Sequence, residues 1–164
     1  MTDAARPFAT RAPFLTTLVC ALTVYCLIYS AVQIGGTPGE RYHTPSWVLA
    51  IHLVTVIPAL PLGAYVLWAR KGTATHKMLG RIWATLMMIT AVDSIWVRAT
   101  TGGIGPIHAF SAITLAAIPL AIYHIKNGNV AAHRRAMTLT YAGLVGAGAF
   151  AMLPGRMVGN FIFG

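Results

Sequence analysis

The chain has 164 residues, of which 57% are hydrophobic and only 9% charged, and its 12 lysines and arginines against three acidic residues give a formal net charge of +9. A soluble domain carries about a quarter charged residues, so this composition excludes a disordered chain, a fibrous repeat and an ordinary water-soluble domain. It predicts a small integral membrane protein. The pI of about 10.3 reflects basic residues that lie in short loops between apolar runs. We interpret these residues as determinants of orientation in the membrane and not as a nucleic-acid-binding surface.

Five apolar runs are each long enough for the roughly 20 residues that a helix needs to cross a hydrocarbon core of about 30 Å. In chain order they cover residues 13–34, 47–69, 76–99, 107–125 and 130–153. Glycine, proline and asparagine punctuate the connections between them, most clearly at 35–39, 102–106 and 127–129. We expect the run at 13–34 to be a retained helix, because it is longer than the 7–15 apolar residues of a signal peptide. Cys20 and Cys26 lie inside this run and fit neither a metal site nor a disulfide framework.

The predicted fold is therefore an all-α membrane protein with five transmembrane helices in one domain over residues 1–164. Nine of the 12 basic residues flank the N-terminus and the turns near 70–81 and 126–135, and three lie on the other side. Because cytoplasmic loops are enriched in Lys and Arg, we expect a bacterial inner-membrane protein with its N-terminus in the cytoplasm and its C-terminus in the periplasm. Four tryptophans near helix ends are interpreted as interfacial anchors: Trp47, Trp68, Trp83 and Trp96.

Two copies of one pattern follow the first helix, at about 46–101 and about 105–157. Each copy has a histidine, a Pro-Leu segment ending in tyrosine, a second histidine 24 or 25 residues after the first, and an arginine 22 or 23 residues later. The matching residues are His52 and His108, Pro61 and Pro119, Tyr65 and Tyr123, His76 and His133, and Arg98 and Arg156. Since each copy crosses the membrane twice, the copies should be parallel repeats that form a four-helix bundle around an axis along the membrane normal.

That axis would place His52 opposite His108 near the outer side, and His76 opposite His133 near the inner side. Ionisable residues inside a membrane are functional candidates, and facing histidines on two helices suit the iron of a b-type haem. The pattern therefore predicts one or two haems, with the two levels roughly 20–30 Å apart along the helices. Arg98 and Arg156 are candidate partners of haem propionates or phospholipids, and snorkelling to the interface is the alternative for each.

Five glycines leave room near these histidines, either for a flat haem ring or for close helix packing. They are Gly63, Gly80, Gly143, Gly146 and Gly148.

Asp93 is the one acidic residue well inside a predicted helix, near the level of His52 and His108. It is a candidate catalytic residue that carries protons for a quinol. Two alternatives stay open: an ion pair with Arg98, or a third ligand beside the two histidines, since a His/His/Asp set suits zinc, copper or non-haem iron.

The stretch from His52 to Arg156 resembles a bacterial family of predicted membrane proteins of unknown function. The residues that carry the resemblance are His52 followed by Pro-Leu-Gly, His76 followed by Gly80-Arg81, Ile107-His108, and His133-Arg134-Arg135 with Met137 and Tyr141. In its architecture and histidine placement the chain is also similar to cytochrome b561, a two-haem membrane electron carrier. That resemblance implies haem ligation by His52 with His108 and by His76 with His133, although the second pair lies close to the helix ends.

Three functions are compatible with these residues. The first is a b-type haem electron carrier that uses a quinol pool. The second is a non-redox membrane protein, either an accessory subunit or a small transporter, with structural histidines. The third is a metal-dependent membrane enzyme built on His52, Asp93 and His108. The expected partners are the lipid bilayer and a quinol, without nucleic acid.

Overall fold

The structure, a computed structural model, describes residues 46–97 and 108–153. Within these ranges every regular element is helical. The elements are α2 (Ser46–Trp68), α3 (Ala74–Asp93), the short 3-10 helix η1 (Ser94–Trp96), α4 (His108–Lys126) and α5 (Val130–Ala151). The all-α prediction is confirmed over these ranges, and four of the five predicted helices lie where the sequence indicated. The predicted first helix at 13–34 lies outside the described residues, as do Arg98 and Arg156.

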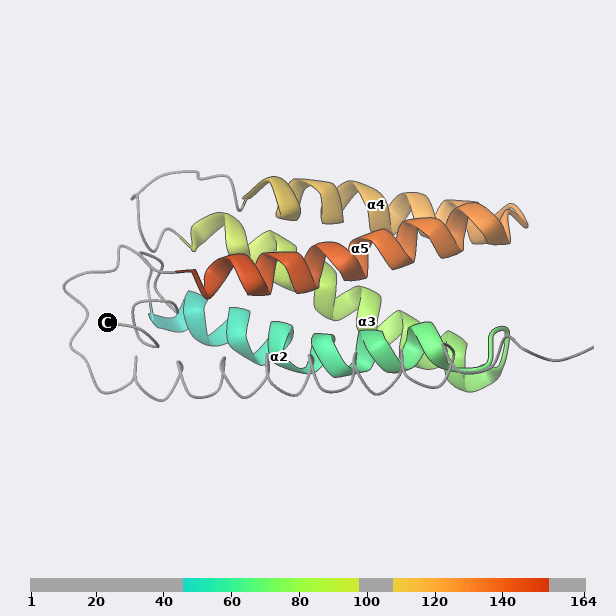
Figure 1. The fold of residues 1–164 in the computed structure, drawn as a ribbon, viewed down its shortest axis with the longest axis horizontal. Helices are drawn as coiled ribbons and strands as arrows, with labels where there is room; N and C mark the ends of the chain where they lie inside the picture. The colour runs from blue at the N-terminus through green and yellow to red at the C-terminus, as the bar shows by residue number, and fades with distance from the viewer. Residues whose placement is uncertain (1–45, 98–107, 154–164) are drawn as a thin grey trace, which may run out of the picture.

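The four long helices run side by side in alternating directions (Figure 1). Each packs against the next in the chain, and α5 also packs against α2, so that α2 and α4 lie on one diagonal and α3 and α5 on the other. The α2–α3 and α4–α5 turns lie at one end of the molecule, called here the turn end. The start of α2, the end of α3 and the start of α4 lie at the opposite end. The contact between α3 and α4 is more extensive than that between α2 and α5.

Both turns at the turn end are set by local sequence. Gly72 and Gly128 adopt φ angles of +80° and +75°, which glycine reaches without the steric cost that a Cβ atom brings. The side chains of Thr73 and Asn129 then accept hydrogen bonds from the backbone N–H groups of His76 and Ala132, at 3.1 and 3.0 Å. These bonds satisfy N–H groups that the first turns of α3 and α5 would otherwise leave without partners.

The end of α3 differs from the prediction. The apolar run continues to residue 99, but the α-helix ends at Asp93 and tightens into η1. The hydroxyl of Ser94 donates to the carbonyl of Ala91 at 2.8 Å, an alternative to regular helix geometry that serine offers at helix ends. Asp93 is therefore the last residue of α3 and does not lie well inside it.

The surface of the described bundle is apolar, and its mostly hydrophobic core contains four buried polar residues, all of them threonines. Many large hydrophobic side chains are exposed, among them Val54, Ile113 and Leu139 at 60% or more. The buried polar side chains are Thr55, Thr90, Thr114 and Thr140. An apolar outer surface, with the few hydrogen-bonding side chains directed inward, is expected for helices that pack against each other in lipid.

Trp83 corrects the interpretation that all four tryptophans are interfacial anchors. It lies in the middle of α3, is only 3% exposed, and donates from Nε1 to the carbonyl of Ala59 at 2.9 Å. Its ring packs against Tyr141 of α5, with 6.5 Å between the ring centroids. A Cβ atom at Gly63 would lie 2.4 Å from Trp83 Nε1 and 2.6 Å from Tyr141 Cδ2. The room at Gly63 is thus filled by these two rings, which favours its close-packing role over space for a haem.

Within residues 46–97 and 108–153, three helical segments are long and apolar enough to cross a membrane: Trp47–Trp68, Ala74–Trp96 and His108–Lys126. The fourth helix, α5, has the length for a crossing but is not among them. It carries His133, Arg134 and Arg135 near its start, and these polar side chains lower its mean hydropathy.

Candidate functional site

His52 and Asp93 form a pair between α2 and α3 at the end opposite the turns. Nδ1 of His52 and Oδ1 of Asp93 are 3.0 Å apart, and the side chains are 23% and 12% exposed. An ionised carboxylate can only accept hydrogen bonds, so Nδ1 is the donor. The pairing leaves the second ring nitrogen, Nε2, as the atom of His52 that can bind a further group. The ion pair of Asp93 with Arg98 that was considered from sequence stays a prediction, because Arg98 lies outside the described residues.

A second interhelical bond indicates the depth of His108. The hydroxyls of Ser94 in η1 and Ser111 in α4 lie 2.5 Å apart, which brings the first turn of α4 beside the residue after Asp93. His108 precedes Ser111 by three residues, or about 4.5 Å along the helix axis. His52 and His108 therefore lie within about one helical turn of each other in depth, on diagonal helices.

His76 and His133 lie at the turn end, near the starts of α3 and α5. Nδ1 of His133 donates to the carbonyl of Ala121 in α4 at 2.9 Å, which again leaves Nε2 for another partner. Nδ1 of His76 is buried and has no hydrogen-bond partner among the described residues. The two imidazoles lie within electrostatic range of each other.

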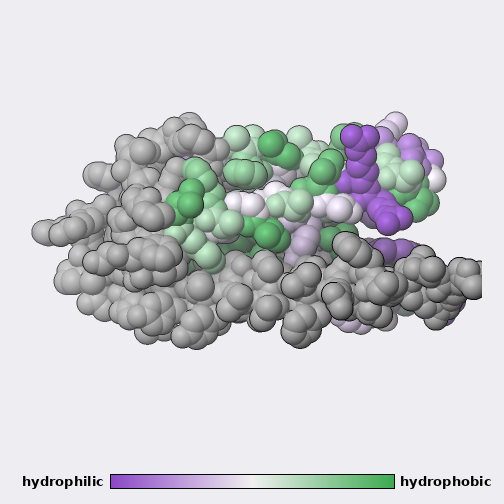
Figure 2. Space-filling model, in the orientation of Figure 1, coloured by the Kyte–Doolittle hydropathy of each residue, from purple (hydrophilic) through white to green (hydrophobic). Residues whose placement is uncertain are grey.

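Basic side chains gather around this turn end, where hydrophilic residues are concentrated in Figure 2. The ammonium of Lys71 donates to the carbonyls of Val66, at 3.1 Å, and Leu67, so it binds the last turn of α2. Desolvation at the turn, followed by the positive charge of Arg134, lowers the pKa of Lys71 below its ordinary value of 10.5. The site at this end is therefore electropositive.

The structure brings His52 together with Asp93, but it does not gather a larger set of ligands. Among the described residues, no three His, Cys, Asp or Glu side chains form a group that could hold a metal ion. The set of His52, Asp93 and His108 that a metal-dependent enzyme requires is thus not assembled. A Cβ atom added at Gly80 or Gly143 would lie 3.7 Å from a side chain of Val66 or Phe110, an ordinary van der Waals distance, and one added at Gly146 would meet nothing within 4 Å.

The sequence analysis did not predict a buried pair of hydroxyl groups that lies about one helical turn from His52, toward the turn end. Thr90 of α3 donates to the Thr55 hydroxyl at 2.8 Å, and Thr55 donates to the carbonyls of Ile51 and His52 at 2.9 and 3.0 Å. Threonine is an ordinary residue in an apolar helix, so neither position stands out alone. The signal was their spacing, since Thr55 and Thr90 each lie three residues from His52 and Asp93, on the same faces of their helices.

The long apolar helices and their exposed apolar surface describe a membrane protein. The model of one family, described as Predicted membrane protein (DUF2306), matches residues 49–162, which is more than two thirds of the chain. The chain belongs to this family, and the resemblance noted from its histidine motifs is confirmed. No curated protein and no solved structure shows significant similarity to the chain. The resemblance to cytochrome b561 therefore stays a prediction.

Proposed function

We propose that the protein is a membrane electron carrier that binds b-type haem through histidines of diagonal helices. His52 of α2 and His108 of α4 would hold haem at the end opposite the turns, and His76 of α3 and His133 of α5 would hold haem at the turn end. From His52 to the last residue of α2 is 16 residues, about 24 Å, so the two levels lie near opposite ends of the bundle.

The observation that carries this proposal is the way two of the histidines are held. Nδ1 of His52 donates to the Asp93 carboxylate, and Nδ1 of His133 donates to the Ala121 carbonyl. Histidines that bind metals commonly donate their other ring N–H to a carboxylate or a backbone carbonyl, which fixes the tautomer and turns the ligating nitrogen toward the metal. Each acceptor comes from a neighbouring helix, so the packing of the bundle orients the imidazole.

His76 also fits haem ligation. Nδ1 of His76 is buried without a hydrogen-bond partner in the described part of the chain, a costly state that a ligand would relieve. When bound, haem supplies iron that carries one electron at a time. The protein's part is to supply neutral imidazole nitrogens, exclude water with apolar helices, and place basic side chains such as Lys71 and Arg134 near the turn end, where propionates could pair with them.

We include the internal repeat and the orientation in this proposal. A parallel repeat accounts for two histidine pairs at matching positions on diagonal helices, α2 with α4 and α3 with α5. The turn end would face the cytoplasm of a bacterial inner membrane because most Lys and Arg residues lie there. The less extensive contact between α2 and α5 than between α3 and α4 is a departure from ideal two-fold symmetry.

The test is an absorption spectrum of the full chain, purified in detergent after expression with ample haem supply, together with metal analysis. The proposal predicts a b-type spectrum that dithionite reduces. Replacing His52 or His108 with Ala should abolish one class of haem. His124→Ala is the matched control, because His124 lies on α4 but belongs to neither predicted pair, and it should retain the full haem content.

A colourless wild-type preparation would overturn the proposal and favour a non-redox accessory subunit or transporter. Bound metal without porphyrin would instead support a metal-dependent enzyme. Equal haem content in the wild type, the His52→Ala variant and the His108→Ala variant would show that these histidines are not the ligands.

A further inference from the structure

The basic side chains of the described bundle have no acidic partners within it. Every Lys and Arg of residues 46–97 and 108–153 lies at positions 70–81 or 126–135, toward the turn end, and all of them are exposed. The one acidic residue of the same ranges, Asp93, lies at the opposite end. No carboxylate of the described chain can therefore neutralise this positive charge, and an anion from the surroundings would stabilise it.

Two of these cations, Lys77 and Arg81, form a pair on α3 that is called here the α3 basic pair. They are four residues apart, so their side chains lie on the same face of the helix. Like charges at this spacing destabilise a helix, and Lys77 also lies in the first turn, where the positive end of the helix dipole favours anions. A phosphate group would relieve both effects, because an Arg guanidinium binds it through two N–H donors and a Lys ammonium attracts it by charge.

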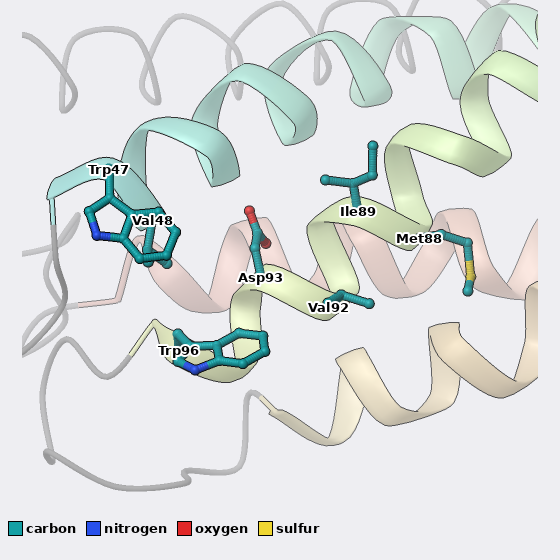
Figure 3. A pocket seen from close by; sticks show the side chains of 7 residues that line it. All are labelled: Trp47, Val48, Met88, Ile89, Val92, Asp93 and Trp96. Atoms are coloured by element: carbon teal, nitrogen blue, oxygen red, sulfur yellow. The ribbon is translucent and has the colours of Figure 1, made fainter.

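An apolar surface continues from the α3 basic pair along the same side of α3. The large side chains that form it are Met78, Ile82, Ile89 and Val92, and they are between 42% and 56% exposed. Ile89 and Val92 also line an apolar pocket beside Asp93 and the start of α2 (Figure 3). From Arg81 to Val92 the helix rises about 16 Å, close to the roughly 15 Å of hydrocarbon in one leaflet. This side of α3 therefore presents a charged end and an apolar length with the dimensions of a phospholipid.

We infer that this side of α3 binds an anionic phospholipid in the leaflet at the turn end. The headgroup phosphate lies between Lys77 and Arg81, and one acyl chain lies along the apolar side chains that follow. A zwitterionic phospholipid brings an ammonium group of its own next to two cations, so the face favours a lipid with net negative charge. The inference is independent of the haem proposal, because the cations placed near the propionates, Lys71 and Arg134, are not part of the α3 basic pair.

The test is native mass spectrometry of the full chain, titrated in detergent with phosphatidylglycerol and with phosphatidylcholine of the same acyl chains. The first lipid is anionic and the second is zwitterionic. The wild type should bind one phosphatidylglycerol about 10-fold tighter than phosphatidylcholine, because each basic side chain at a membrane surface attracts anionic lipid.

Two double variants with the same loss of charge assign this preference to α3. Lys77→Gln combined with Arg81→Gln should make the two affinities nearly equal. Lys126→Gln combined with Arg135→Gln removes the same charge from the turn end, but from α4 and α5, and should keep the preference. All four side chains are exposed, so both double variants should fold like the wild type.

A competition experiment separates a lipid site from a site for phosphate alone. Glycerophosphoglycerol, the deacylated headgroup, contacts the α3 basic pair but not the apolar length of the face. It should therefore not displace phosphatidylglycerol when both are present at the same concentration. Displacement would show that the cations bind a soluble phosphate ester and would overturn the assignment to a lipid.

Equal affinity of the wild type for the two lipids would show that Lys77 and Arg81 only reach interfacial water, and it would overturn the inference without any variant. An equal loss of preference in both double variants would indicate diffuse positive charge and would also overturn it. Loss of haem without loss of lipid preference in the Lys77 and Arg81 double variant would assign these cations to propionates instead. A colourless wild type that keeps the preference would disprove the haem proposal and leave the lipid site intact.

Discussion

Single polar residues in this bundle act as pairs that join helices. His52 with Asp93 and Thr55 with Thr90 join α2 to α3, and Ser94 with Ser111 joins α3 to α4. Hydrogen bonds between membrane helices contribute only about 0.6 kcal/mol on average and up to about 1.7. Their main effect here is therefore to fix the register of α2, α3 and α4 near the candidate site, while apolar packing supplies most of the stability.

The threonine pair predicts that removing the hydroxyl of Thr55 destabilises the protein more than removing that of Thr90. Thr90 donates to Thr55, whereas Thr55 donates to its own helix. Thr55→Val removes the acceptor of a buried hydroxyl and should cost about 1–3 kcal/mol, while Thr90→Val leaves Thr55 bonded and should cost about 1 kcal/mol or less. Thermal unfolding in detergent measures the order, with exposed Thr85→Val as the control. A larger loss in Thr90→Val than in Thr55→Val would contradict the assigned donor direction.

Gly63 gives a second prediction, based on close approach. Gly63→Ala would place Cβ 2.4 Å from Trp83 Nε1 and 2.6 Å from Tyr141 Cδ2, both within the packed core. Overpacking of this kind costs about 1–3 kcal/mol, so the midpoint of thermal unfolding should fall. Gly146→Ala on α5 is the matched control, because its Cβ meets nothing within 4 Å. Unchanged stability of Gly63→Ala would show that the contact between α2 and the two rings is looser than described.

At the scale of elements, the ammonium group of Lys71 binds the C-terminal turn of α2. Lys71 binds two of the carbonyls that a helix C-terminus leaves without intrahelical partners, and its positive charge opposes the negative end of the helix dipole. The same ammonium lies near Arg134 of α5, which disfavours its charged form. The α2–α3 turn is thus coupled electrostatically to the start of a helix from the second half of the chain.

The lowered pKa of Lys71 predicts how stability changes with pH. The pKa of Lys71 is lower in the folded chain than its ordinary 10.5, so the unfolded chain binds more protons between the two values, and this residue's contribution to stability rises with pH across that window. Arg134→Gln should raise the folded pKa of Lys71 and flatten that rise. The rate of amine acylation at Lys71 against pH reports the pKa. Arg135→Gln, at the neighbouring position, should change it less, and an equal shift in both variants would contradict a specific role of Arg134.

Much of the element order could be predicted from sequence, because its signals are local. Apolar runs and the Gly- and Asn-containing turns at 72 and 127–129 mark α2 to α5 within a few residues. The burial of Trp83 could not be predicted, since it depends on a glycine of another helix, 20 residues earlier in the chain, that admits the ring. The sequence predicted that His52 and Asp93 lie at a similar depth, but not that they form a hydrogen bond. A contact between residues 41 positions apart depends on the rotation of α2 and α3 about their axes. The hydrophobic periodicity of two uniformly apolar helices does not reveal that rotation.

At the scale of the whole molecule, the bundle has two chemically different ends. The turn end carries Lys71, Arg134 and two histidines with basic neighbours. The opposite end carries the one described carboxylate, Asp93, next to an apolar pocket. Such ends are compatible with the electron carrier proposed above, whose donor and acceptor would arrive from different sides. The distribution of Lys and Arg predicts that the turn end faces the cytoplasm.

The last prediction is the direction in which the bundle is inserted. Single cysteines at exposed Thr75 and Asn127 mark the turn end, and one at exposed Leu153 marks the opposite end, in a chain whose Cys20 and Cys26 are replaced by serine. In intact bacterial cells a membrane-impermeant maleimide should label only the cysteine at 153, and after permeabilisation it should label all three. Because both turns lie at one end of the bundle, residues 75 and 127 must behave alike. Labelling of one of them but not the other would contradict the fold, whereas labelling of both in intact cells would preserve the fold and reverse the predicted orientation.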